Sequence, residues 1–331
     1  MRRLGLLCVV LLMALAACEP AQQQPARQAA TADNAPIQPK LPAGIDAPPP
    51  IPADNPLTTA KIELGRQLFF DPRLSADGIV SCATCHNPVM GFTDGRPTSM
   101  GVKGQIGGRS APSVINLAYA TNGVFWDGRA KSLEDQAKGP IANPIEMGTT
   151  HEAMVANLNG ISGYKEQFQR VFGSPEITID NVARAIASFE RTIISGNSPW
   201  DKFQKGDAGA LSDSAKRGWD IYQKKANCIA CHTGFNLTDN NYHNLGVGLD
   251  KAEPDLGRYV ITKMEEDKGR FKTPTLREIT YTGPYMHDGR FRTLEEVIEF
   301  YNKGGIKNAQ LDKEVKALNL TATEKADLLP S

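Results

Sequence analysis

Apolar residues recur at helical spacing in several short stretches of the 331-residue chain, which are separated by loops rich in glycine and proline. The clearest stretch runs from Ile179 to Ile194, with Asp180 as a possible N-terminal cap. Ser132 and Thr293 are each followed by acidic residues, a pattern typical of the first turn of a helix. Strand signals are few. The pattern therefore predicts a mostly α protein in which loops make up much of the rest.

Residues 1–18 have the layout of a bacterial lipoprotein signal peptide. Two arginines precede apolar residues 4–17, a run that is too short for a comfortable membrane span. The run ends in Leu-Ala-Ala-Cys18, which resembles a lipobox, in which the cysteine is lipid-modified and becomes the mature N-terminus. Glu19 follows, so the aspartate that signals retention in the inner membrane is absent. We expect a periplasmic lipoprotein anchored in the outer membrane; plain secretion, with Cys18 incidental, is the alternative.

Two further segments have the composition of connections. Residues 19–56 are rich in Ala, Gln and Pro, a composition that cannot bury a core, so we expect a semi-extended linker and folded structure from about Leu57. Glycine and proline are again frequent in residues 195–211, which form the best boundary between domains. The expected domains are therefore residues 57–195 and 196–331.

Overall composition excludes several classes of protein. The chain is 40% hydrophobic and 22% charged, which is typical of a globular protein. Its 37 basic residues balance 37 acidic residues, so it has no overall basic character that would suit nucleic acid. After the signal peptide, no stretch approaches the roughly 20 apolar residues that span a bilayer, so a lipid anchor is the membrane attachment we expect.

The cysteines indicate the chemistry. Of six, Cys8 and Cys18 lie in the signal peptide, and the other four form two C-x-x-C-H motifs, Cys82-Ala83-Thr84-Cys85-His86 and Cys228-Ile229-Ala230-Cys231-His232. In an exported chain paired thiols normally form disulfides, but this spacing is the attachment pattern of c-type haem. Two thiols three residues apart reach the two vinyl groups of one porphyrin, and the following imidazole ligates the iron. The sequence therefore predicts two covalently bound haems, with His86 and His232 as proximal ligands.

The segments around the two motifs resemble each other. Gly65-Arg66-Gln67-Leu68-Phe69 precedes the first motif, and Gly218-Trp219-Asp220-Ile221-Tyr222 precedes the second. Downstream, Trp126-Asp127-Gly128-Arg129 corresponds to His287-Asp288-Gly289-Arg290. This duplication with a long period predicts two cytochrome c-like domains, each enclosing one haem.

With these motifs the chain resembles the bacterial di-haem cytochrome c peroxidases and, within them, the MauG-like branch. The shared signatures are both C-x-x-C-H sites, the A-P-[ST] and W-D-G-R-A segment at residues 111–130, and the P-Y-x-H-D-G segment at residues 284–289. The resemblance implies an N-terminal haem that meets peroxide, a C-terminal haem that handles electrons, and Trp126 between them. It also implies that Gln136 and Glu146 belong to the distal pocket of the first haem.

The last two residues suit that role chemically. A carboxylate such as Glu146 can take the proton from one oxygen of iron-bound peroxide and return it to the leaving oxygen. The amide of Gln136 can donate to a peroxide oxygen and hold it in line, and an aromatic Trp126 offers a route for an oxidising equivalent. The structural alternatives are a helix-surface Gln136, a loop Glu146 and a core Trp126.

The iron ligands that the resemblance implies depart from the standard peroxidase. The family's removable distal histidine lies in a segment like S-x-G-H-K, where this chain has Val102, so we expect an open first haem. Met90 or Met100 could replace that ligand, although packing is the commoner role of methionine. The usual methionine ligand of the second haem falls at Tyr301, a MauG-like trait, and a phenolate stabilises ferric iron. The alternative is a buried helix Tyr301 with Met286 as the ligand.

The resemblance further implies a calcium ion between the domains, held partly by the backbone carbonyls of Thr282 and Pro284. The family's side-chain amide ligand falls at Ser110, which weakens one oxygen donor. Of the remaining histidines, we expect His151 at a solvent-exposed helix start. His243 and His287 match family positions that we interpret as supporting the haem surroundings.

Three functions follow. The first is a peroxidase that reduces hydrogen peroxide with electrons from a small periplasmic donor, a c-type cytochrome or a cupredoxin, relayed from the C-terminal to the N-terminal haem. The second is a MauG-like oxidase that uses peroxide to modify a residue of a partner protein. The third is a plain electron carrier, which has no need of Gln136 or Glu146. Val102 and Tyr301 favour the second function and the wider family favours the first, which we take as the main expectation.

Overall fold

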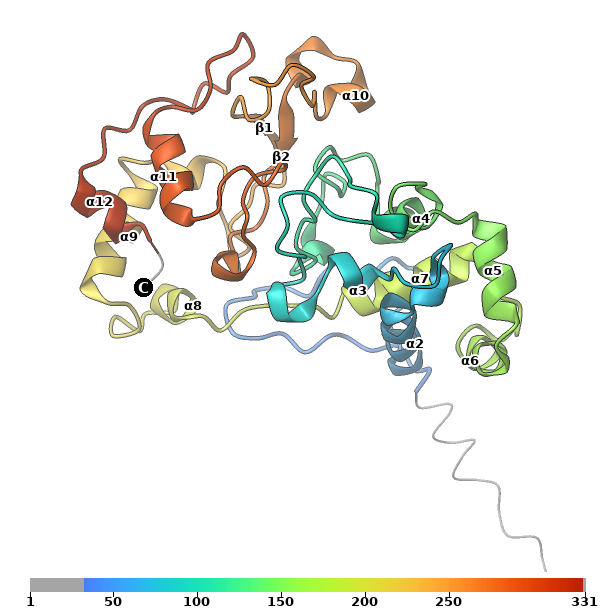
Figure 1. Ribbon diagram of the computed structural model, residues 1–331. Helices are drawn as coiled ribbons and strands as arrows, with labels where there is room; N and C mark the ends of the chain where they lie inside the picture. Colours follow the sequence, from blue (N-terminus) through green and yellow to red (C-terminus); the bar gives the residue numbers. More distant parts are fainter. Residues whose placement is uncertain (1–32, 330–331) are drawn as a thin grey trace, which may run out of the picture.

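The computed structural model describes residues 33–329 (Figure 1). The signal peptide, Cys18 and the first part of the predicted linker therefore lie outside the described residues. The helix-rich fold expected from the sequence is confirmed. In Figure 1, α2 to α7 form one group on the right, whereas α8, α9, α11 and α12 form a second group on the left. None of the helices in residues 33–329 has the length and apolar character needed to cross a membrane.

The described part of the chain contains short helices and one small sheet. The α-helices are α2 (Thr59–Phe70), α3 (Cys82–Cys85), α4 (Leu133–Ala142), α5 (His151–Asn159), α6 (Ser162–Phe172), α7 (Ile179–Glu190), α8 (Pro199–Gln204), α9 (Asp213–Gln223), α10 (Tyr259–Thr262), α11 (Leu294–Asn302) and α12 (Ala322–Asp327). The strands β1 (Tyr242–Asn244) and β2 (Arg270–Lys272) are antiparallel, with His243 opposite Phe271.

Side-chain caps fix the helix starts. Ser132 and Thr293 cap α4 and α11 by accepting from backbone N–H groups, as their sequence pattern predicts. The cap predicted at Asp180 is wrong, because Thr178 accepts from the Asn181 N–H and Asp180 lies in the first turn of α7. An acidic side chain is stabilised there by the helix dipole, so Asp180 has a helix-start role of a different kind.

The core of the N-terminal half forms where α2 packs along α7. Leu64, Leu68 and Phe69 are at most 1% exposed and belong to one buried cluster with Ile186 of α7. The two helices approach closely at Gly65, where a Cβ atom would lie 1.8 Å from the Ala185 carbonyl oxygen. Only glycine is compatible with this crossing.

In the C-terminal half, α9 and α12 cross in the same way. A Cβ atom at Gly218 would lie 1.8 Å from the carbonyl oxygen of Asp327. The Asp327 carboxylate in turn accepts from Arg217 Nε at 2.8 Å and from Ser214 Oγ at 2.5 Å. Gly65 and Gly218 hold matching places in the two repeats, so one packing device is used twice.

The described part of the proline-rich segment, residues 33–56, is extended but packed against the body, which differs from the free linker expected. The Ala47 carbonyl accepts from Tyr119 Oη at 2.8 Å, and the Ala43 carbonyl accepts from Asn197 N at 2.6 Å. Asn55 is 1% exposed and donates to Glu134 Oε1 at 2.7 Å. The hydrogen-bonding groups of this segment find partners that are distant in the sequence. Its composition therefore does not reveal the packing.

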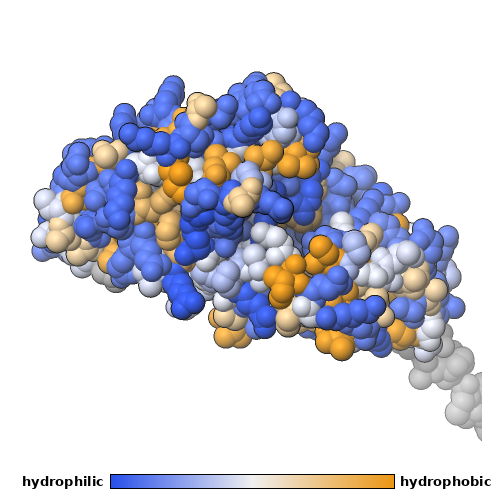
Figure 2. Space-filling view, turned by 45° about the horizontal axis from the view of Figure 1, so that its top comes forward, coloured by the Kyte–Doolittle hydropathy of each residue, from blue (hydrophilic) through white to orange (hydrophobic). Residues whose placement is uncertain are grey.

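Arginine ion pairs connect distant segments, one within the C-terminal half and one between the halves. Arg277 donates to both carboxylate oxygens of Asp201 at 2.8 Å, and both side chains are almost fully buried. Arg109 bridges Asp127 at 2.7 Å and Asp255 at 2.6 Å. On the face shown in Figure 2 the surface is mostly hydrophilic, with hydrophobic residues gathered in small patches.

Candidate functional site

A cavity of about 610 Å³ lies between the two halves and receives side chains from both. Eight residues that the sequence predicts for the site line it, namely Cys82, Cys85, His86, Trp126, Gln136, Glu146, Thr282 and Pro284. The remaining predicted site residues, Cys228, Cys231, His232 and Tyr301, do not line this cavity. The structure therefore gathers the first haem motif and the predicted distal residues in one place, and the second motif in another.

The first motif presents its groups to the cavity from a single helical turn. Cys82 and Cys85 begin and end α3, and Ser81 and Thr84 form a capping box at its start. Burial raises the pKa of the Cys82 thiol to about 12 and that of the Cys85 thiol to about 11. The His86 Nδ1 lies 3.1 Å from the Phe92 carbonyl oxygen, which directs Nε2 away from that bond. An imidazole held in this way is oriented to ligate a metal.

The second motif repeats this arrangement with different supports. Cys228 begins the 3₁₀ turn η5 (Cys228–Ala230), and His232 Nδ1 lies 3.1 Å from the Leu237 carbonyl oxygen. Tyr222 of α9 donates to the His232 carbonyl at 2.5 Å. The residues of both motifs therefore fit a covalently bound haem, because each has two free thiols and an imidazole whose Nδ1 is already engaged.

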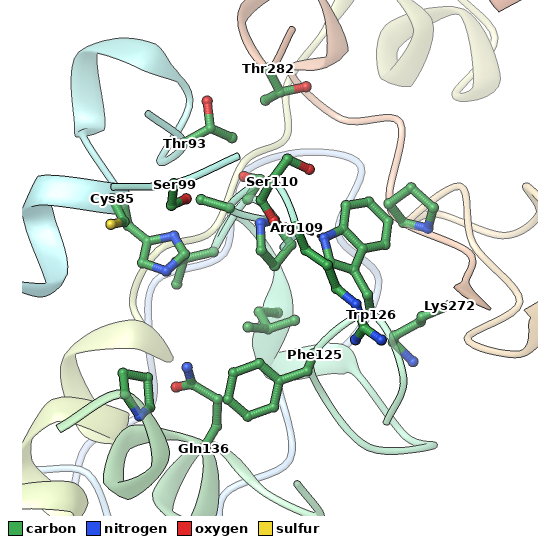
Figure 3. Close-up of a pocket in the computed structure, with 18 of the residues that line it drawn as sticks. Cys85, Thr93, Ser99, Arg109, Ser110, Phe125, Trp126, Gln136, Lys272 and Thr282 are labelled. Carbon is green, nitrogen blue, oxygen red and sulfur yellow. Dashed lines mark hydrogen bonds between the residues drawn. The ribbon is translucent and has the colours of Figure 1, made fainter. Parts of the chain in front are cut away.

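The two predicted distal residues come from α4 and the loop that follows it. The Glu146 carboxylate accepts from Asn143 Nδ2 at 2.7 Å. Burial raises the pKa of Glu146, although Arg129 and Asn143 act in the opposite direction. The Gln136 side chain points into the cavity beside Phe125 (Figure 3), and its amide makes no hydrogen bond within residues 33–329. A carboxyl that can hold a proton therefore shares the cavity with an unengaged amide.

Trp126 lies at the junction of the halves. Its indole Nε1 donates to the Ser110 carbonyl at 2.9 Å, and its own carbonyl accepts from the backbone N–H of Lys272 in β2 at 2.7 Å. Figure 3 shows Trp126 next to Lys272 and Arg109 at one side of the cavity. Ser110 of the N-terminal half thus holds the indole, and Lys272 of the C-terminal half holds the backbone of the same residue.

The segment where the family places its distal histidine holds no iron ligand on the cavity wall. Val102 is 2% exposed and packs in the hydrophobic core, and its N–H donates to the Glu146 carbonyl at 2.8 Å. Met90 and Met100 are each more than a third exposed and do not line the cavity. A Cβ atom at Gly101 would lie 1.9 Å from the Ile145 carbonyl, so glycine permits this close approach.

Tyr301 lies on α11 close to the second motif. Burial raises the pKa of its hydroxyl, and the thiols of Cys228 and Cys231 raise it further. The hydroxyl makes no hydrogen bond among the described residues, so it is free to meet a ligand. Met286, the alternative, lines the cavity of the first motif, and its carbonyl accepts from Ser110 Oγ at 3.0 Å.

The residues named for calcium and the three remaining histidines have varied surroundings. Thr282 Oγ1 donates to the Ile279 carbonyl at 3.2 Å, and the Ser110 hydroxyl is engaged with Met286. His151 begins α5, half-buried, with Nε2 2.9 Å from the Lys138 carbonyl. His287 is 3% exposed and stacks on Phe271 with ring centroids 3.5 Å apart.

His243 lies between two carboxylates close to the second motif. Its Nδ1 is 2.6 Å from Asp312 and its Nε2 is 2.8 Å from Asp239. Cys231, Asp239 and His243 bring possible ligand atoms within 4.8 Å of one another. A thioether bond between Cys231 and haem would remove the thiolate from this group, so it does not form a convincing separate metal site.

Sequence patterns did not reveal several charged groups on the cavity wall. Glu190 at the end of α7 is 4% exposed, its Oε2 has no hydrogen-bond partner within residues 33–329, and burial raises its pKa to about 8. Burial likewise lowers the pKa of Lys272 to about 8. Arg109 was also missed. Such residues have no motif, because their burial depends on partners far away in the sequence.

Comparisons with known proteins agree with the arrangement of the site. A family model for di-haem cytochrome c peroxidases matches residues 59–209. The methylamine utilization protein MauG of Methylorubrum extorquens is 44% identical over 283 residues, covering 85% of this chain and 79% of that protein. The cytochrome c551 peroxidase of Nitrosomonas europaea is 44% identical over 252 residues, covering 76% of this chain and 75% of that protein.

Solved structures share the fold. The chain aligns with a MauG-like protein associated with microbial copper homeostasis with a TM-score of 0.81 and 35% identity, covering 87% of this chain and 92% of that chain. The diheme peroxidase BthA of Burkholderia thailandensis has the same fold, with a TM-score of 0.71 at 21% identity. Sequence identity over most of both chains confirms the resemblance carried by the motifs, and the chain belongs to the di-haem cytochrome c peroxidase family.

Proposed function

We propose that this chain is a periplasmic peroxidase that reduces hydrogen peroxide at its N-terminal haem with electrons relayed from its C-terminal haem. The observation that carries the proposal is the shared cavity of Cys82, Cys85, His86, Gln136 and Glu146. We place the N-terminal haem domain at residues 57–195 and the C-terminal haem domain at residues 196–331.

The chain's own residues hold the cofactors. Cys82 and Cys85 would attach the first haem, with His86 Nε2 toward its iron, and Cys228, Cys231 and His232 would do the same for the second. When bound, haem iron supplies the centre at which electrons pass to peroxide. The contacts of His86 Nδ1 and His232 Nδ1 with backbone carbonyls would hold each ring so that Nε2 faces the iron.

Glu146 is the residue that would transfer the peroxide proton. Breaking the O–O bond of peroxide requires a proton to leave one oxygen and reach the other. Partial burial raises the pKa of the Glu146 carboxyl, which favours its accepting and returning that proton, while Asn143 holds one of its oxygens. The free Gln136 amide can donate to a peroxide oxygen and orient it. Trp126, held by Ser110 and Lys272 between the halves, suits the passage of electrons toward this cavity.

The second candidate is a MauG-like oxidase that uses peroxide to modify a residue of a partner protein. Two observations favour it. Val102 lies in the core, so its segment offers no iron ligand to the first site. The Tyr301 side chain lies beside Cys228 and Cys231, where its oxygen could ligate the iron of the second haem once the iron displaces the phenolic proton that burial favours. The two candidates share their first step, the reaction with peroxide, and differ in what supplies the electrons.

Glu146→Gln tests the shared step. The substitution keeps size and polarity but removes the carboxylate, so the rate of reaction with peroxide should fall by on the order of 10² to 10⁴ while haem content is retained. Stopped-flow absorbance in the Soret region measures that rate. Glu152→Gln, a change at an exposed carboxylate of α5, is the matched control and should react at the parent rate. A Glu146→Gln protein that reacts as fast as the parent would contradict the proposal.

The setting of the enzyme completes the proposal. We propose an outer-membrane lipid anchor at Cys18, a small redox protein of the periplasm as electron donor, and calcium held in part by the Thr282 and Pro284 carbonyls. Support for the anchor comes from the sequence alone, and support for calcium from the family pattern and from the position of both residues at the cavity. Removal of calcium with a chelator should then weaken the contact between the halves without releasing either haem.

A further inference from the structure

A row of oxidisable aromatic side chains connects the second haem motif with α8 and α9. Tyr222 stacks on Trp219 with ring centroids 5.1 Å apart and an interplanar angle of 23°. Trp219 in turn meets Trp200 of α8 edge to face, with centroids 5.5 Å apart. All three side chains are half-buried, so the row extends from the protein interior to the surface. We call these three residues the aromatic triad.

The inner end of the triad is bonded to the haem-attachment motif. The Tyr222 hydroxyl donates to the carbonyl of His232 at 2.5 Å, and His232 is the residue whose imidazole fits the iron of the second haem. A continuous path therefore runs through one hydrogen bond from the iron-binding residue to the phenol, and through ring contacts to the two indoles. Phenol and indole rings lose an electron far more readily than a benzene ring does.

The first haem motif lacks this feature. Phe69 and Arg66 hold the places in the first repeat that Tyr222 and Trp219 hold in the second. Phe69 contacts Phe70, Phe92 and Phe189, with centroid distances of 5.2 to 6.4 Å, and its ring lies 6.5 Å from that of His86. Arg66 pairs with Glu63 at the surface. The ring that takes the place of Tyr222 before the first motif is thus packed among phenylalanine rings, which resist oxidation.

The charges around Trp200 permit its oxidation. The Arg277 guanidinium lies 5.7 Å from the Trp200 ring centroid and would oppose a positive charge there. Both Asp201 carboxylate oxygens accept from Arg277 at 2.8 Å, which neutralises that cation. The buried Trp200 Nε1 has no hydrogen-bond partner within residues 33–329, so no neighbouring base takes its proton. Trp200 would therefore lose and regain an electron without moving a proton.

We propose that the aromatic triad carries electrons one at a time between the α8–α9 face and the C-terminal haem. The inference rests on the proposed reaction with peroxide. Reduction of one hydrogen peroxide to two water molecules consumes two electrons and two protons, so the triad is crossed twice in each turnover. At each crossing an indole gives one electron inward and regains one from an external one-electron donor. Tyr222 bridges Trp219 and the haem motif without being oxidised itself, because its hydroxyl donates to the His232 carbonyl and meets no base that could take its proton. No bond therefore forms or breaks within the triad.

Peroxide without a donor provides the test. Under that condition the missing electrons are drawn from the triad itself, and a residue that loses two electrons and two protons and adds one water molecule gains one oxygen atom. The hydrogen peroxide accepts those electrons and protons and becomes two water molecules. The chain has three tryptophans, so peptide mass spectrometry reads each site separately. In the haem-loaded parent we expect oxygen addition at Trp219 and Trp200.

Two variants should redistribute the oxidation. Tyr222→Phe, which installs the residue of the first repeat, should lower oxygen addition at Trp219 and Trp200 several-fold. Trp219→Phe should remove most of the addition at Trp200. Tyr259→Phe on α10, whose ring lies near the ammonium groups of Lys263 and Lys268 and is not part of the triad, is the control and should match the parent. Haem content and circular dichroism confirm that each variant folds.

The experiment distinguishes a failure of the proposed electron path from a failure of the proposed function. If the parent consumes peroxide but Tyr222→Phe shows the parental level of oxidation at both indoles, the triad is not the path. If Glu146→Gln, which should react with peroxide slower by on the order of 10² to 10⁴, is oxidised at both indoles as fast as the parent, dissolved peroxide attacks them directly and the inference also fails. If the parent does not consume peroxide at all, the proposed function itself fails.

Discussion

In both halves of the molecule, the helix before the haem-attachment motif crosses another helix at a glycine that touches a backbone carbonyl. Gly65 meets Ala185 and Gly218 meets Asp327, each with a hypothetical Cβ contact of 1.8 Å. In both halves the histidine of the motif is held through Nδ1 by a backbone carbonyl five or six residues later. The two halves therefore share one haem-holding frame, which consists of the helix crossing at glycine and the histidine held through Nδ1.

The surroundings of that frame differ. The first motif opens on a cavity with Gln136 and Glu146 and has Val102 in the core behind it. The second motif has the free hydroxyl of Tyr301 beside it and the oxidisable triad behind it. The comparison teaches that duplication preserved the parts that hold a cofactor, while the parts that decide its reactivity changed. This account assigns peroxide chemistry to the first half and electron transfer to the second.

The largest expected effect comes from the shared frame. Gly65→Ala and Gly218→Ala should each destabilise the fold by about 3 kcal/mol or more, since the new methyl group overlaps a backbone oxygen that cannot move freely. Chemical denaturation followed by circular dichroism measures the loss. Gly163→Ala on α6, where a Cβ atom meets nothing within 4 Å, is the matched control and should be neutral or slightly stabilising. If only one of the paired glycines proved sensitive, the frame would not be shared.

A second prediction sharpens the difference at the iron. Tyr301→Met should raise the potential of the C-terminal haem by on the order of 0.1 V, within the roughly 0.8 V range that axial ligands set. A neutral thioether stabilises the reduced iron that an anionic phenolate disfavours. Spectroelectrochemical titration reads the two haems separately. An unchanged potential would mean that Tyr301 does not touch the iron and would favour Met286.

A third prediction concerns the pH dependence of stability and rests on Glu190, a buried carboxyl on the wall of the first cavity. Burial raises its pKa from the ordinary 4.5 to about 8, and nearby Arg191 lowers it while Glu134 raises it. The folded protein then binds more protons than the unfolded chain between these values, so the free energy of unfolding should fall as pH rises through that window, by at most about 1.4 kcal/mol per unit. Glu190→Gln should flatten this fall. Urea unfolding across the window measures it, and an identical slope in parent and variant would refute the assignment.

Features of the fold and site that depend on residues close together in the chain could be predicted from the sequence. The two C-x-x-C-H motifs, the caps at Ser132 and Thr293 and the helix-rich character follow from residues close together in the chain, and the structure has the predicted caps and helices. The cap of α7 was misplaced by two residues because Thr178 and Asp180 both suit a helix start. Neighbouring candidates of this kind are resolved only by the backbone itself.

Features that depend on distant partners were not predictable. The packing of residues 33–56 relies on Tyr119, Glu134 and Asn197, each far along the chain. Burial of Glu190 and the contact between Trp200 and Trp219 likewise come from the way helices meet. The family resemblance supplied candidate roles for Glu146, Gln136, Trp126 and Tyr301, and these roles remain predictions.

The central claim is that the first haem is open to peroxide and the second is closed by a protein ligand. Electron paramagnetic resonance of the oxidised protein as isolated tests this most directly, because the spin state of ferric haem reports whether a strong sixth ligand is present. The account predicts one high-spin and one low-spin ferric signal, with peroxide reacting before any reduction of the protein. Two low-spin signals, together with a strict need for prior reduction, would contradict it.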